Sequence, residues 1–318
     1  VAVGANSLSA NTTANDNTGI GVAALLTNIT GAVNTAVGRS ALRLNTTGGS
    51  NTATGCGALC ANTTGASNTA NGLESMKKNT TGTSNVAIGS SALTCNTTAD
   101  CNIAIGQSAL FINSTGASNT AVGTRSMQCN TTGADNTAIG TQSLFSNTTG
   151  VSNVAIGTTA LDANTTASGN TAVGRSSLGN NTTGHSNVAV GCVALLTNTT
   201  GNYHTGVGHG AAKCNTTGTD NTALGADAME RVTTGARNTA VGRLTGKGHT
   251  TGNENTSIGN KAGCNVTTGS NNVLLGHIAG TDAVKDVTSE SHHIVIGNNY
   301  STNAFIKIDW TVTSDLRD

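Results

Sequence analysis

The sequence lacks proline, and aromatic residues make up only 2% of it. A bulky globular core built from Phe, Tyr and Trp is therefore excluded, and any buried interior has to consist of small aliphatic side chains. Charged residues make up 9%, and the 15 basic and 15 acidic residues cancel. We therefore expect no basic patch for nucleic acid or an anionic membrane. No run of 18 apolar residues occurs, so we also expect no membrane insertion.

The composition that is present points to an ordered chain. Disordered segments usually combine a high net charge with few β-branched residues. Here the net charge is zero, Val, Ile and Thr are abundant, and Gly numbers 42. The chain opens at Val1 part-way through a repeat and without a visible signal peptide, so we expect the array to continue before this residue.

A short, regular repeat runs through the chain. The motif Asn-Thr-Ala-Val-Gly at Asn34 recurs at every seventeenth position in 17 copies, counting a truncated one before Val1, and a last copy arrives late at His293. The consensus is N-T-A-V-G-x-S-A-L-x-x-N-T-T-G-x-S, and we number its positions 1 to 17. A unit this short cannot bury an apolar face alone. It is typical of one coil of an all-β solenoid or β-roll, in which each coil stacks on the next.

Repeat positions with a fixed residue type predict the corners and the core. Position 5 is Gly in every copy, such as Gly38, which indicates a backbone corner. Thr-Thr-Gly at positions 13 to 15 predicts a second corner. Aliphatic residues at position 4, such as Val37, and Leu or Met at position 9, such as Leu42, are predicted to face the core from two short β-prone runs.

The array is expected to span residues 1–276 and to be a rod roughly 80 Å long. Residues 277–318 are expected to form an atypical capping segment, with an insertion from Thr281 to His292, and a junction to an absent C-terminal domain. One coil carries little apolar area, so we expect several copies of the chain to wrap around one axis. A homotrimer is the most direct arrangement, and rods that join end to end are compatible with it.

The repeat resembles known families. The run N-T-A-[VI]-G-x-x-[AS]-L-x-x-N-T-T-G is similar to head repeats of trimeric autotransporter adhesins and, more closely, to tandem repeats of phage and giant-virus fibre proteins that end in an S74-type intramolecular chaperone. The resemblance covers residues 1 to about 300. It implies a trimeric left-handed β-roll that acts as a stalk or an adhesive fibre. It also places a family-type self-cleavage junction at Ser314 and Asp315, although a cut there would not leave residues 315–318 attached.

Glycosylation is the sharpest chemical prediction. Position 12 is Asn in 13 consecutive copies, always followed by x-Thr, and three further Asn residues form the same acceptor motif. If these residues carry glycans, a sugar chain would emerge from nearly every coil. The alternative is that Asn-Thr-Thr-Gly only forms a turn. The candidate acceptors are Asn11, Asn28, Asn45, Asn62, Asn79, Asn96, Asn113, Asn130, Asn147, Asn164, Asn181, Asn198, Asn215, Asn255, Asn265 and Asn299.

The cysteines are compatible with disulfides or buried thiols and argue against a metal site. No C-x-x-C pair occurs among the eight, so we expect no zinc. Cys56 with Cys60, and Cys95 with Cys101, are close enough in sequence to bridge within a coil. The other four could pair between chains or stay buried thiols. An oxidising, extracellular setting fits such cysteines.

The expected function is structural, and we expect no enzyme and no cofactor other than covalent glycans. The seven His residues fall at scattered repeat positions and the acidic residues do not cluster, so the sequence indicates no catalytic group. The chain is expected to be an extracellular filament or fibre shaft on a cell or virion surface. The alternatives are a receptor-binding adhesin or tail fibre that contacts a receptor or cell-surface glycans, and an ice-binding solenoid with Thr rows at positions 2, 13 and 14.

Overall fold

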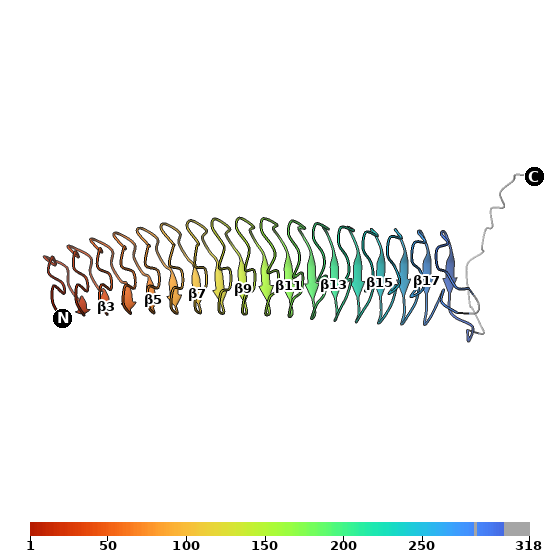
Figure 1. Cartoon of the computed structure of the whole chain (residues 1–318), viewed down its shortest axis with the longest axis horizontal. Coiled ribbons are helices and arrows are strands. Elements are labelled where there is room, and N and C mark those ends of the chain that lie inside the picture. Colours follow the sequence, from red (N-terminus) through yellow and green to blue (C-terminus); the bar gives the residue numbers. More distant parts are fainter. Residues whose placement is uncertain (283–284, 302–318) are drawn as a thin grey trace, which may run out of the picture.

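The computed structural model describes residues 1–282 and 285–301. Within these residues the chain is an all-β parallel solenoid of about 17 coils, drawn out as a slightly curved rod (Figure 1). None of the described residues is helical, so none forms a helix that could cross a membrane. The strands are β1 (Ala2–Val3), β2 (Thr18–Ile20), β3 (Thr35–Val37), β4 (Thr52–Thr54), β5 (Thr69–Asn71), β6 (Val86–Ile88), β7 (Ile103–Ile105), β8 (Thr120–Val122), β9 (Thr137–Ile139), β10 (Val154–Ile156), β11 (Thr171–Val173), β12 (Val188–Val190), β13 (Thr205–Val207), β14 (Thr222–Leu224), β15 (Thr239–Val241), β16 (Thr256–Ile258), β17 (Val273–Leu275) and β18 (Ile294–Ile296).

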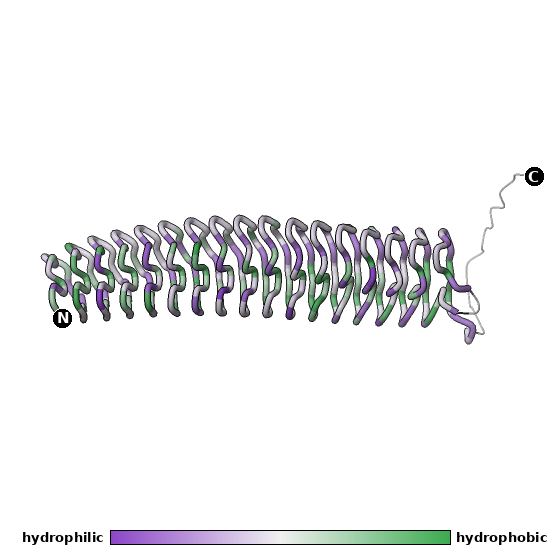
Figure 2. The backbone as a smooth tube through the Cα atoms, viewed as in Figure 1, coloured by the Kyte–Doolittle hydropathy of each residue, from purple (hydrophilic) through white to green (hydrophobic). Residues whose placement is uncertain are grey.

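The strands form one sheet in which each pairs in parallel with its neighbours in the sequence. The register advances by one repeat per coil, so that Thr35 of β3 lies beside Thr52 of β4. From β2 to β17 the offset is one full repeat at every step, and identical repeat positions therefore stack into rows along the rod. Apolar and polar segments accordingly recur coil after coil (Figure 2).

Each coil contains one strand, not the two that the sequence suggested. The strand occupies positions 2 to 4, and the rest of the coil is turns and bends. These turns still bond to the next coil through the backbone, as in Leu42 N–H to Ala58 C=O at 3.0 Å and Thr46 N–H to Thr63 C=O at 2.9 Å. The second β-prone run therefore satisfies its amides between coils without adopting strand dihedrals.

The predicted corner at position 5 is confirmed. Gly38 has a φ of 133°, and every copy of this glycine from Gly4 to Gly276 lies between 118° and 140°. A Cβ at Gly38 would also lie 2.6 Å from the Gly55 carbonyl oxygen of the next coil. Both the dihedral and the close stacking of coils require glycine here.

Three further positions of each coil have left-handed backbone conformations. Positions 7, 9 and 17 have positive φ, for example 60° at Ser40, 49° at Leu42 and 60° at Ser50. This conformation explains why position 9 becomes glycine at Gly246, Gly263 and Gly280, where φ is 57°, 61° and 71°. A glycine adopts that dihedral without the steric cost that Leu incurs, so the substitution keeps the backbone of the coil.

The core confirms one predicted position and corrects the other. At position 9, twelve Leu or Met side chains are fully buried, among them Leu42 and Met76. Position 4 is wrong as a core position, because no residue there from β2 to β17 is buried and Ile105 keeps 37% of its surface exposed. Side chains alternate along a strand, and it is the position-3 alanine, such as Ala36, that points inward.

The predicted insertion lies at the end of the stack. β18 pairs with β17 across more than one repeat, since Val273 lies beside Ile294. The extra length forms a small loop in which Lys285 pairs with Glu290 at 3.1 Å and Thr281 bridges to Asp286. Glu290 also accepts hydrogen bonds from the Thr288 and Ser289 amides. The Thr288 amide, the backbone amide of Glu290 itself and the Lys285 ammonium lower the pKa of the Glu290 carboxyl to about 2.

Candidate functional site: buried amide ladders and an uncharged sheet face

Two rows of buried asparagines run through the interior beside the aliphatic seam, which is the row of buried position-3 Ala and position-9 Leu or Met side chains. We call them the position-12 ladder and the position-1 ladder. In the position-12 ladder, Asn45 Nδ2 donates to Asn28 Oδ1 at 2.7 Å and to the Gly48 carbonyl at 2.8 Å. The same step joins every member of the row from Asn11 to Asn215, at 2.7 to 3.2 Å.

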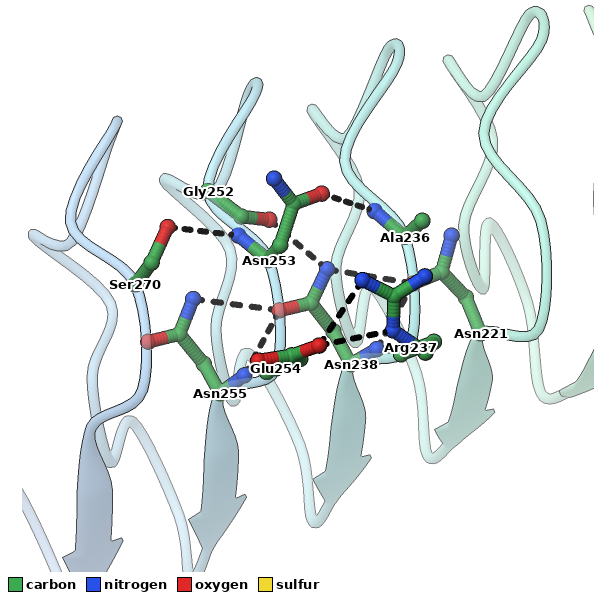
Figure 3. Close-up of polar contacts among 9 residues, drawn as sticks. All are labelled: Asn221, Ala236, Arg237, Asn238, Gly252, Asn253, Glu254, Asn255 and Ser270. Atoms are coloured by element: carbon green, nitrogen blue, oxygen red, sulfur yellow. Dashed lines mark hydrogen bonds and ion pairs between the residues drawn. The ribbon is translucent and has the colours of Figure 1, made fainter.

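The position-1 ladder uses the backbone as well. The Asn51 amide N–H donates to Asn34 Oδ1 at 3.0 Å, and Asn34 Nδ2 donates to the Gly48 carbonyl at 2.9 Å. Figure 3 shows this pattern at Asn221, Asn238 and Asn255, with the Arg237–Glu254 ion pair on the exposed side. A carboxamide is both donor and acceptor, so the same side chain can bond on each side in a stack of identical coils.

Most of the predicted glycosylation sites lie in these buried ladders. Twelve of the thirteen position-12 asparagines, from Asn28 to Asn215, are fully buried, and so is Asn255 of the position-1 ladder. Their Nδ2 atoms are hydrogen-bonded inside the coil, where a sugar has no space. This geometry is incompatible with glycans on them in the folded coil, and the Asn-Thr-Thr-Gly motif acts as a ladder and a turn. Only Asn265 and Asn299 are exposed, and Asn11 in the first described coil is half-buried.

Histidine replaces asparagine in both ladders. His204 stands in the position-1 ladder, where its Nε2 lies 2.6 Å from the Gly218 carbonyl and its Nδ1 accepts the Asn221 N–H at 3.2 Å. The ring thus reproduces the donor and the acceptor of an Asn amide when it is neutral with the proton on Nε2. Burial lowers the pKa of His204, which keeps it in that form.

The position-12 ladder ends above Asn215. The row continues with Val232, His249 and Val266, all buried. No hydrogen-bond donor reaches Asn215 Oδ1 among the described residues, and neither ring nitrogen of His249 has a partner there. Burial lowers the pKa of His249 to about 4. The row therefore changes from polar to apolar with one titratable group between two valines.

The outer face of the sheet carries no charge. None of the strands β1 to β18 in the described residues contains Asp, Glu, Lys, Arg or His. Position 2 is Thr, Val or Ile in every strand from β2 to β18, and position 4 is aliphatic except at Thr54 and Asn71. Both positions point outward, so two rows of β-branched and aliphatic side chains run along the rod. Ile20, Ile88, Ile105, Ile139, Ile156 and Ile258 are among the exposed members.

The remaining candidate residues form no site in the part of the chain that the structure describes. All eight cysteines are free thiols, so neither Cys56–Cys60 nor Cys95–Cys101 is bridged in the structure. No group of three His, Cys, Asp or Glu side chains in residues 1–282 and 285–301 is arranged to hold a metal ion. Ser314 and Asp315, the predicted cleavage junction, lie outside the described residues.

Sequence reasoning found the position-12 asparagines but missed that they are interior, and it assigned no role to position 1. A signal was present, because position 1 is Asn in all but two copies and a solvated turn residue is rarely so constant within one array. Comparison with known proteins adds no assignment. No protein family matches the chain, and no curated protein is significantly similar to it.

Proposed function

We propose that this protein is the shaft of an extracellular filament or fibre, with a mechanical role and no catalytic one. The observation that carries the proposal is the register of the 17 parallel strands β1 to β17, which advances by one repeat at every step. The position-1 ladder follows these strands, and the position-12 ladder joins the coils from Asn11 to Asn215. Every coil is tied to the next by backbone and side-chain hydrogen bonds, so bending the rod would distort many bonds at once.

The sheet face supplies the surface by which shafts associate. It is about 80 Å long and about 10 Å wide, which is comparable with the ~800 Å² per partner of a stable interface. Exposed apolar rows of this extent mark interaction sites in soluble proteins. Since the face has no charged residue that would have to be desolvated, a second copy of the same chain fits it. The resemblance to trimeric fibres sets the expected number of chains at three, in a left-handed roll.

The test compares two isoleucines of the same coil that are equally exposed. Ile105 on β7 and Ile112, which lies outside the strand in the turns of the coil, each keep 37% of their surface exposed. We expect the full chain to be a trimer by light scattering and rod-shaped by electron microscopy. Ile105→Lys places a charge in the interface and should weaken association at least tenfold, whereas Ile112→Lys should leave it unchanged. A monomeric parent chain, or equal effects of both variants, would contradict the interface.

An adhesin or tail fibre is the second candidate, because the rows at positions 6, 10 and 16 vary from coil to coil and would give a receptor an irregular surface. Binding of the chain to cells or to immobilised glycans tests it. Ice binding needs the sheet face to be free of a partner, so it is tested by the thermal hysteresis of a chain that proves monomeric.

A further inference from the structure

The Thr at position 14 is the most constant exposed side chain of the array. All 16 described copies are Thr and all are exposed. They are Thr13, Thr30, Thr47, Thr64, Thr81, Thr98, Thr115, Thr132, Thr149, Thr166, Thr183, Thr200, Thr217, Thr234, Thr251 and Thr268. Exposed positions of a repeat are normally free to vary, since substitutions there change stability little. Position 17, which is exposed in every described copy, does vary in this way and admits Ser50, Cys101, Tyr203 and Arg237.

The fold does not account for this constancy. In the part of the chain that the structure describes, no position-14 hydroxyl makes a hydrogen bond. The neighbouring position-13 hydroxyl does, as in Thr46 Oγ1 to the Thr63 carbonyl at 3.0 Å, yet that position admits Ile29 and Ser114. A need for a β-branched shape would also admit Val or Ile, as position 2 does at Val86 and Ile103.

We propose that the position-14 threonines are a modification array, in which the hydroxyls carry O-linked sugars along one edge of the rod. Each hydroxyl stands at the second corner, two positions after a buried position-12 Asn, on the outside of the turn. The γ-methyl group restricts rotation about Cα–Cβ, which gives all attached groups a similar direction. The sugar coat that the sequons suggested would thus be attached at the exposed Thr of Asn-Thr-Thr-Gly.

The reaction is a glycosyl transfer from a nucleotide-activated sugar. Thr Oγ1 attacks the anomeric carbon and forms the new C–O bond while the bond from that carbon to the nucleoside diphosphate breaks. The diphosphate leaves with the electron pair, and the hydroxyl proton passes to a base of the transferase. A neutral sugar fits better than phosphate, because phosphates stacked about 4.8 Å apart would repel one another along the entire row.

The first arm of the test is site mapping on protein isolated from its source. Trypsin should release residues 44–77, which contain Asn45 and Asn62 together with position-13 and position-14 threonines of two coils. Electron-transfer fragmentation should place hexose-type additions on Thr47 and Thr64, and alkaline β-elimination should remove them. An unmodified peptide, or sugar on Asn45, Asn62, Thr46 or Thr63, would overturn the proposal.

The second arm asks whether Thr is needed for folding, using the chain produced without glycosyltransferases. Thr64→Val should leave the thermal midpoint within error of the parent, because the hydroxyl makes no internal bond. Thr63→Val is the matched control and should lower it, because Thr63 Oγ1 donates to the Thr80 carbonyl at 3.0 Å. An equal loss in both variants would show that position 14 is structural and would overturn the array. Neither arm depends on the number of chains in the fibre.

Discussion

At the scale of single residues, the interior is unusual in stacking amides where a globular core would stack hydrocarbon. A buried polar group costs free energy unless its hydrogen bonds are made. Each Asn of the position-12 ladder from Asn28 to Asn198 meets this requirement with two donated bonds and one accepted bond, as Asn130 does with Asn113, Gly133 and Asn147. Asp could not replace it, because a carboxylate cannot donate to the oxygen below.

His249 makes the stability of the rod depend on pH. Its pKa in the folded chain is about 4, against 6.5 for an ordinary His, so the unfolded state binds the proton more strongly between these values. The free energy of unfolding therefore has its full value above pH 6.5. It falls as the pH drops from 6.5 to 4, by about 3 kcal/mol in total. We expect His249→Val, which copies Val232 and Val266 in the adjacent coils, to reduce this dependence.

Thermal unfolding at pH 7 and at pH 4.5 measures the effect. The parent chain should lose thermal stability at the lower pH, and the His249→Val variant should lose clearly less. The remaining dependence belongs partly to His204, whose pKa is also lowered by burial, and His204→Asn in the same background reports it. Equal pH dependence in the parent and His249→Val would show that this ring is solvated in the folded chain.

At the scale of the coil, a short strand and several left-handed residues replace the usual long strands of a sheet. Non-glycine residues in this conformation each cost on the order of 1 kcal/mol, and the coil has up to three. Contacts between stacked coils hold these residues in the left-handed conformation, because Leu42 at position 9 must both turn the chain and fill the core. The fold of one coil is therefore enforced by its neighbours.

The two glycine corners should respond differently to substitution. Gly140 has a φ of 133°, and an added Cβ would lie 2.6 Å from the Gly157 carbonyl group, so Gly140→Ala should cost at least about 2 kcal/mol. Gly133 at position 15 has no positive φ, and Ala99 and Ala167 already occupy that position. An added Cβ at Gly133 would lie 2.5 Å from the Gly150 carbonyl oxygen, so the coil has to shift there, but the dihedral suits alanine. We therefore expect Gly133→Ala to cost less than Gly140→Ala. Comparable losses in chemical denaturation would mean that both corners require glycine.

At the scale of the whole molecule, the rod is one-dimensional, because each coil contacts only the coils before and after it. The inter-strand contacts follow this order without exception from β1 to β18. Within residues 1–282 and 285–301, no closed core fixes the number of coils. The number of coils can therefore change without disrupting the fold, whereas the 17-residue length of each coil cannot.

Deletions distinguish length from phase. Removing residues 136–152 joins Asp135 to Asn153 and restores the repeat, so this variant should keep its circular dichroism and lose about 4.8 Å of length. Removing residues 136–153 leaves one coil a single residue short and without its position-1 Asn. That coil cannot close in register, so we expect a broader unfolding transition and a lower midpoint. Tolerance of both deletions would contradict a strict coil length.

The sequence by itself determined the period, the stacking of one coil on the next, the glycine corner at position 5 and the buried Leu or Met at position 9. These follow from local requirements, since a fixed spacing dictates rows, an unvarying glycine marks a dihedral that other residues avoid, and a large aliphatic side chain in every coil has to be buried.

Only the tertiary structure decided which of the other side chains face the interior of the coil and which face outward. Position 4 is as aliphatic as position 9, yet strand alternation turns it outward once Ala36 and its equivalents face the core. Asn45 belongs to a glycosylation motif, yet it is interior because the coils above and below supply both an acceptor and a donor. A polar side chain can be buried only when its partners are in place, and here those partners lie one full repeat away in the sequence.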